Sequence, residues 1–152
     1  MTGRVDFYIA DGARAAERGN GARTEVLACR LAEKAWRLGH RVYVHTNGEE
    51  ESRRLDQLLW TFSQGSFVPH RCLGAGHRDS VDGDPVAIGH AEPQGEGGRE
   101  VLINLQDAAA GWFGRFERIA EVVGEGEAHK ARARERYKNY KNDGVEVVVH
   151  NL

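Results

Sequence analysis

The sequence has few cysteines and no long apolar run, and each absence narrows what the chain can be. Cys29 and Cys72 are the only two cysteines, and they lie far apart without a CxxC spacing. Neither a disulfide framework nor a cysteine-based zinc site is therefore indicated, and we expect two reduced thiols. No apolar segment approaches the roughly 20 residues that a membrane span requires. The amino terminus, MTGRVDFYIADG, lacks the pattern of a signal peptide, so we expect a cytoplasmic protein without membrane contact.

The composition indicates one ordinary globular domain covering residues 1–152. Of the 152 residues, 40% are hydrophobic and 29% are charged, which is typical of soluble globular proteins of this length. The formal net charge is -2. A domain that binds nucleic acid directly normally carries an overall basic charge, and this chain does not.

Strand and helix patterns alternate along the chain. β-branched and aromatic residues or helical spacing of apolar residues mark the segments, and Asn47 is the expected cap of the second helix. The expected strands are 5–10, 41–46, 86–90, 101–105, 118–123 and 145–150, and the expected helices are 22–38, one that begins at 49, 108–113 and 130–141. Residues 63–85 are expected to be irregular, and the GEGG run at 95–98 is expected to form a hairpin loop. The order predicts an α/β sandwich whose central sheet is mostly parallel and flanked by helices.

The loop after the first strand is where such a fold would bind a nucleotide. The run DGARAAERGNGAR at 11–23 contains neither GxGxxG nor GxxxxGK[ST], and Gly19-Asn20-Gly21 is better interpreted as a turn. Ser66 is not within GxSxG. We therefore expect a fold that resembles nucleotide-binding proteins but has no nucleotide site, no cofactor and no catalytic residues.

Two groups of polar side chains are candidates for metal binding. His70, Cys72 and His77 are able to bind metal, but their spacing matches no known zinc site and no fourth ligand is evident. The acidic residues at 79, 82 and 84 lack the glutamate that closes a calcium loop. We expect a solvated turn and no metal.

The segment KARARERYKNYK at 130–141 is the most unusual part of the chain. It carries six basic side chains against the single Glu135, a local charge of +5 in a chain whose net charge is -2. At about 100° per residue on a helix, Lys130, Arg134, Lys138 and Lys141 share one side, with Tyr137 beside them. Ala133 and Tyr140 face the core, and Asp143-Gly144 ends the helix.

Two interpretations of this basic face remain open from its spacing alone. Cations in the last turns of a helix complement its dipole, and a charged face is often no more than solvated surface. The same arrangement also suits an anionic partner, because arginine binds a carboxylate through two hydrogen bonds and lysine supplies a point charge.

Three motifs in the same order resemble one protein family. RLDQLLW at 54–60, SFVPH at 66–70 and ARERYK at 133–138 resemble the chi subunit of bacterial DNA polymerase III holoenzyme. WRLGHRVYV and EVLIN also match, so the similarity extends over nearly the whole chain. The resemblance implies a non-catalytic accessory protein of the clamp-loader assembly.

The resemblance also implies two binding surfaces. Chi proteins bind the acidic C-terminal tail of single-stranded DNA-binding protein, which ends in proline, phenylalanine and the free carboxylate. The positions that match the family's tail-binding residues are Lys130, Arg134, Tyr137, Lys138 and, in a more generic motif, Val123. DNA would then be reached only indirectly.

The second surface implied by the resemblance is the group Trp60, Phe67 and Pro69, which in the family contacts the psi subunit and, in some bacteria, a helicase. The alternative is that Trp60 continues the core face of its helix and Phe67 covers the sheet edge. For the chain as a whole, a small enzyme or nucleotide-binding domain of the same fold class and a direct nucleic-acid binder using the basic helix remain the alternatives.

Overall fold

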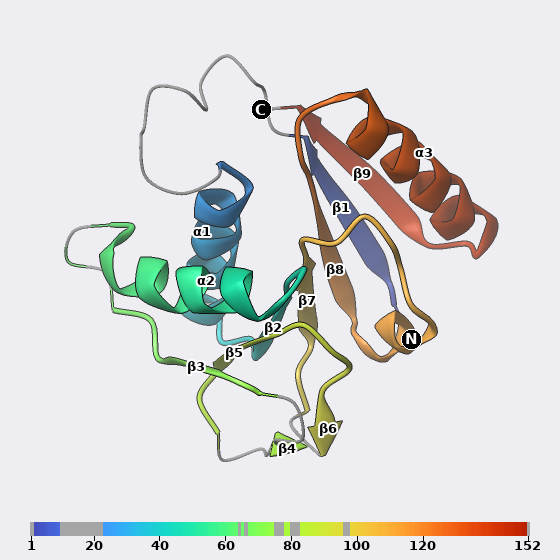
Figure 1. The fold of residues 1–152 in the computed structure, drawn as a ribbon. Coiled ribbons are helices and arrows are strands. Elements are labelled where there is room, and N and C mark those ends of the chain that lie inside the picture. The colour runs from blue at the N-terminus through green and yellow to red at the C-terminus, as the bar shows by residue number, and fades with distance from the viewer. Residues whose placement is uncertain are drawn as a thin grey trace.

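The computed structural model describes residues 2–9, 23–63, 65, 67–74, 78–79, 83–95 and 98–151 (Figure 1). The elements, in chain order, are β1 Arg4–Ile9, α1 Arg23–Arg37, β2 Val42–His45, α2 Glu49–Thr61, β3 His70–Cys72, β4 Arg78–Asp79, β5 Val86–Gly89, β6 Gln94–Gly95, β7 Val101–Asn104, the 3₁₀ helix η2 Gly111–Arg115, β8 Arg118–Val123, α3 Glu127–Asn142 and β9 Glu146–Asn151.

Seven of the strands form one sheet in the order β3-β5-β2-β7-β8-β1-β9, and every pairing in it is parallel. Helices α1 and α2 cover one face, and α3 covers the opposite face near β9, β1 and β8 (Figure 1). A parallel sheet needs cover on both faces because its strands are buried on both sides. The predicted α/β fold with a mostly parallel sheet is confirmed.

The alternation of side chains along β1 separates the two faces. Val5 and Phe7 are buried in the cluster that includes residues of α3, whereas Tyr8 packs against the cluster formed with α1 and α2. Because successive side chains of a strand point to opposite faces, Asp6 lies on the same face as Tyr8. The short sequence VDFYI therefore supplies residues to two separate surfaces.

The predicted hairpin between the fourth and fifth strands is wrong. The strands β5 and β7 do not pair with each other: both are parallel to β2 and lie on either side of it. The connection through the glycine-rich run must therefore cross from one side of β2 to the other, which a tight hairpin turn cannot do. Glu96 and Gly97 of that run lie outside the described residues.

The segment predicted to be irregular, 63–85, contains the strand β3, which is only three residues long and extends the sheet beyond β5. A strand of that length is too short to show an alternating pattern. In addition, β4 pairs with β6 in a separate two-stranded sheet. The short helix predicted at 108–113 is instead the 3₁₀ helix η2, a few residues later.

Asn47 does not cap α2 as predicted. The capping position is Gly48, and the backbone and side-chain N–H groups of Asn47 both donate to the Glu51 carboxylate, at 2.9 and 3.0 Å. Other predicted helix ends are confirmed, since Gly39 and Gly144 follow α1 and α3 with φ of 89° and 80°. This left-handed region suits glycine, which has no Cβ. The expected turn at 19–21 lies outside the described residues.

A buried polar cluster ties α3 to the sheet. The Glu121 carboxylate on β8 is fully buried and accepts hydrogen bonds from the Tyr140 hydroxyl at 2.6 Å and the Asn104 amide at 2.7 Å. The Arg136 Nε lies 3.4 Å from the same carboxylate. Burial raises the pKa of Glu121, and the charge of Arg136 and the hydrogen bonds oppose that effect. Burial and the nearby carboxylate also raise the pKa of Tyr140, which keeps its hydroxyl a donor.

We predict that Tyr140→Phe lowers the free energy of unfolding by about 1–3 kcal/mol, because one buried oxygen of Glu121 then lacks a donor. Urea unfolding followed by circular dichroism measures the change. Tyr137→Phe is the matched control, since no hydrogen bond of its hydroxyl to a described residue is present, and it should change stability by less than about 0.5 kcal/mol. Equal stabilities of the two variants would contradict the role given to this cluster.

We also predict that both thiols of the native protein react slowly with iodoacetamide. Burial raises the pKa of Cys29 to about 12 and that of Cys72 to about 11, with the negative charges of Glu25 and Asp56 adding to the effect. Because the thiolate is the reactive form, alkylation at pH 8 should be at least about a hundredfold slower than in urea. Mass spectrometry of timed samples measures the rates, and rapid native alkylation of Cys72 would refute the expectation.

Candidate functional site

A cavity of about 300 Å³ opens between α3 and the edge of the sheet formed by β8, β1 and β9. The strands contribute aliphatic and aromatic side chains, and α3 contributes basic, aromatic and small ones. Its lining residues are Phe7, Ile9, Val123 and Val149 from the strands and Lys130, Ala133, Arg134, Tyr137 and Lys138 from α3. An apolar cavity bordered by a few polar groups is the usual form of a ligand site.

All five residues that the resemblance places in a tail-binding site line this one cavity. They come from two segments, Val123 at the end of β8 and the four α3 residues Lys130, Arg134, Tyr137 and Lys138. Helical spacing places the α3 residues on one side. Val123 joins them because β8 ends next to the start of α3.

Sequence reasoning missed four lining residues: Ala133 of α3, which it placed on the core side only, and three strand residues, Phe7, Ile9 and Val149. A signal for the strand residues does exist in the alternation of β1 and β9. Phe7 and Ile9 follow Val5 at intervals of two, and Val149 follows Val147 in the same way, so each set points to the α3 face. What the sequence does not give is the pairing of β9 with β1, which brings the two sets together.

The basic side chains of the cavity remain available to a ligand. In the part of the chain that the structure describes, Lys130 and Lys138 have no ion pair. Arg134 lies 3.8 Å from Glu127, with both side chains largely exposed, which makes this a weak surface pair. Lys141 does not line the cavity, and its Nζ lies 5.7 Å from the centre of the Tyr137 ring.

Two of the six basic residues of 130–141 have structural roles instead. Arg132 forms an ion pair with Asp107 at 3.1 Å, and Arg136 is buried and donates to the Asp107 carbonyl at 2.7 Å. His129 also contacts the Asp107 carboxylate, at 2.6 Å. These contacts attach α3 to the loop after β7, and the positive charge that a ligand meets is smaller than the sequence count suggests.

The chemistry of the cavity suits an apolar group that carries negative charge. The apolar side chains would desolvate a hydrophobic ring, while Lys130, Arg134 and Lys138 offer charged N–H donors at the border. The Tyr137 ring lies 6.1 Å from the Phe7 ring in a tilted arrangement. This geometry already forms the aromatic wall against which another ring packs favourably.

A second surface lies at the far end of the sheet, near β3. The Trp60 and Phe67 rings have centroids 5.3 Å apart and remain 47% and 62% exposed, so neither side chain is part of the buried core. Pro69 is half-buried beside them. The buried His70 fixes this segment, because its ring contacts Trp60 and its two nitrogens lie 2.6 and 2.9 Å from the carbonyls of Val68 and Asp56. Exposed aromatic groups of this kind are typical of protein interfaces.

Among the described residues, no group of three or more histidine, cysteine or carboxylate side chains is arranged to hold a metal ion. His77 and Asp82 of the two motifs tested above lie outside those residues. Within the same described part of the chain, none of the helices has the length and apolar character to cross a bilayer.

Comparison of the whole structure with solved proteins finds the crystal structure of T4 UvsW, with a TM-score of 0.62 and 8% sequence identity. The match covers 99% of this chain but only 41% of the other, so the chain spans about two fifths of that protein. At this identity the likeness shows a shared fold alone.

Sequence comparisons are more specific. The family model of the DNA polymerase III chi subunit, HolC, matches residues 1–148. DNA polymerase III subunit chi of Pseudomonas aeruginosa is 40% identical over 149 residues, covering 98% of this chain and 96% of that protein. The Escherichia coli subunit is 36% identical over 120 residues, covering 79% and 80%. With its parallel sheet, its basic helix and these relatives, the chain belongs to the family of DNA polymerase III chi subunits.

Proposed function

We propose that this protein is a non-catalytic accessory subunit of DNA polymerase III that binds the acidic C-terminal tail of single-stranded DNA-binding protein in the cavity beside α3. The observation that supports the proposal most directly is that Lys130, Arg134, Tyr137, Lys138 and Val123 all line that cavity. If the basic side of α3 were only solvated surface, there would be no reason to expect an apolar cavity next to it.

The end of the tail matches both the apolar part of the cavity and the basic side chains at its border. In the proposed complex, the terminal phenylalanine ring enters the apolar part, between Tyr137 and the strand residues. The free carboxylate and the preceding aspartates meet the basic side chains, with Arg134 able to form paired hydrogen bonds and the two lysines supplying point charges. Charge directs the approach of the tail, and the apolar cavity selects its last residue.

A single tail should bind weakly. One short peptide buries little surface, and its charge contacts at the border of the cavity are exposed to screening by salt. The tetrameric partner presents several tails, however, and a replisome that holds more than one contact gains affinity through effective concentration. Weak single contacts also allow rapid exchange during replication.

We predict that Arg134→Glu or Lys138→Glu weakens binding of a synthetic tail peptide by about tenfold or more, because a repulsive charge replaces an attractive one. Fluorescence anisotropy of a labelled peptide measures the affinity. Arg30→Glu is the matched control: Arg30 is exposed on α1, far from the cavity, and the change in net charge is the same.

Two further observations check the same site. A peptide without its final phenylalanine should lose most of its affinity, and higher salt should weaken the intact peptide. Affinity that is equal in Arg134→Glu and Arg30→Glu would show that the tail does not bind beside α3.

The aromatic surface at Trp60, Phe67 and Pro69 is proposed to bind the second partner, the psi subunit where one exists or a helicase in its place. Its support is the exposure of these two adjacent, mutually tilted rings, which is unusual for side chains of that size. The surface lies beyond β3 at one edge of the sheet, whereas the basic cavity adjoins β9 at the other edge. Both partners could therefore bind at once, which is what a linking subunit requires.

We predict that Phe67→Ala, and Trp60→Ala more strongly, reduce co-purification of psi while leaving tail-peptide affinity unchanged. Removal of an exposed aromatic anchor removes binding energy, with little effect on a core to which it contributes little. Thermal melting of each variant checks that the fold is retained, and Lys138→Glu serves as the reciprocal control. Wild-type recovery of psi with both alanine variants would refute this assignment.

A further inference from the structure

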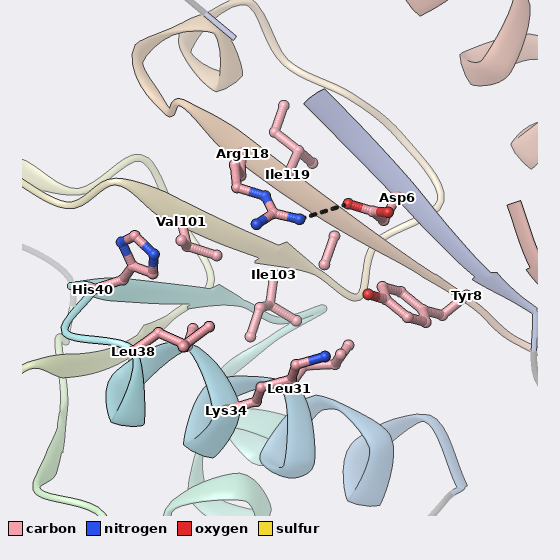
Figure 2. Close-up of a pocket in the computed structure, with 12 residues that line it drawn as sticks. Asp6, Tyr8, Leu31, Lys34, Leu38, His40, Val101, Ile103, Arg118 and Ile119 are labelled. Atoms are coloured by element: carbon pink, nitrogen blue, oxygen red, sulfur yellow. Dashed lines mark hydrogen bonds and ion pairs between the residues drawn. The ribbon is translucent and has the colours of Figure 1, made fainter. Parts of the chain in front are cut away.

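A groove on the opposite face of the sheet separates the last turns of α1 from β7, β8 and β1 (Figure 2). Its cavity encloses about 100 Å³, enough for a small ion with a few carbon atoms. Most of its lining is aliphatic and comes from both sides of the groove: Leu31, Ala35 and Leu38 on α1 and just after it, and Val101, Ile103 and Ala120 on the strands.

Three donor groups from three different elements border this groove. Tyr8 extends from β1, Lys34 from α1 and Arg118 from β8, and all three line the same cavity. Figure 2 shows the Arg118 guanidinium directed towards Asp6, at the border of this cavity. Neither the Tyr8 hydroxyl nor the Lys34 ammonium has a hydrogen bond or ion pair with any of the described residues. Arg118 uses Nη2 to contact Asp6 at 3.3 Å, and its other N–H groups have no acceptor in the same part of the structure. Convergent donors above an apolar floor are typical of a ligand site.

The one acidic side chain of the groove, Asp6, does not cancel this charge. Its carboxylate is buried and accepts hydrogen bonds from Arg4, at 2.9 to 3.2 Å, and from Arg118, and lies 3.0 Å from His150 Nε2. Burial acts to raise the pKa of Asp6, but these partners outweigh it and lower the pKa. The negative charge is thus already surrounded by cationic groups, and the groove retains an excess of positive charge for a second anion.

The position of the Tyr8 hydroxyl is fixed before any ligand arrives. The Tyr8 ring stacks on the His150 ring with centroids 4.6 Å apart and an angle of 9° between the planes. A donor held in place by packing loses little conformational entropy on binding. The groove therefore has the features of a prepared site and not of a chance gap between side chains.

We propose that this groove binds a small anion, a carboxylate or phosphate group attached to a short apolar body. The anionic group would contact Arg118, Lys34 and the Tyr8 hydroxyl, and the apolar body would lie on the aliphatic floor. The site is separate from the cavity beside α3, so it neither depends on the tail-binding proposal nor supports it.

Nuclear magnetic resonance titration of the full chain tests the site with matched probes. Butyrate carries the anion on an apolar chain, butyramide has the same shape without charge, and inorganic phosphate has charge without the chain. We expect saturable shifts of resonances from Tyr8, Lys34 and Arg118 with butyrate, and none with butyramide. Saturation by phosphate as well would support the anion site and show that the charge dominates recognition.

Variants locate the binding. Tyr8→Phe keeps the ring that stacks on His150 and removes only the hydroxyl. Lys34→Gln removes a surface charge that has no ion pair with any residue the structure describes. Each should weaken butyrate binding about threefold to tenfold. Arg134→Glu, in the other cavity, should leave it unchanged. Thermal melting confirms that the variants fold.

The source of the anion is tested with the acidic tail peptide. If the peptide shifts the Tyr8 and Lys34 resonances, and still does so in Arg134→Glu, the anion that the groove binds is the terminus of a chain. If the peptide shifts only resonances of α3, the groove binds a free small molecule. No saturable shift in the groove with any of the anions, or wild-type affinity in both groove variants, would overturn the proposal.

Discussion

The buried carboxylate of Glu121 and the donors around it determine where α3 lies. This helix of 16 residues buries only Ala133, Arg136 and Tyr140, which is too little apolar surface to fix its position by hydrophobic packing alone. Two of those three side chains interact with Glu121. The Tyr140 hydrogen bond to Glu121 and the Arg136 hydrogen bond to the Asp107 carbonyl are directional, so together they restrain both the distance and the rotation of the helix. As a result of that rotation, Lys130, Arg134 and Lys138 border the cavity, where Arg134 and Lys138 also remain exposed to solvent.

The strand β1 contributes side chains to a cavity on each face of the sheet. Phe7 and Ile9 line the cavity beside α3, and Asp6 and Tyr8 line the groove beside α1. The two sites are separated by a single layer of backbone. A change of one residue in the register of β1 would exchange the two sets and remove both sites at once. The same strand carries the buried acidic residue Asp6, whose carboxylate is contacted by Arg4, Arg118 and His150.

Local patterns were sufficient for much of the fold and part of the site. Periodicity identified α1, β8 and the basic helix, and helical spacing brought Lys130, Arg134, Tyr137 and Lys138 to one side. Long-range pairing was not accessible in the same way: nothing in the sequence near Val86 or Val101 shows that β2 lies between their strands. The roles of Arg132 and Arg136 were missed for a related reason. Their partners, Asp107 and Glu121, are distant in sequence, and a charged residue next to other charged residues gives no sign that it is buried.

The strand β1 lies between β8 and β9, next to one edge of the sheet, and this position affects the order of folding. Val5 pairs with Ile119 on one side and with Val147 on the other. The first strand of the chain can therefore pair only with strands near the end of the chain. Contacts between such distant segments close large loops, which slows the search for the native state. The lining of the cavity beside α3 comes from β1, β8, α3 and β9. A folding intermediate in which one of these four elements is not yet in place therefore lacks the complete cavity. A partner that recognises this cavity selects only molecules whose folding is complete.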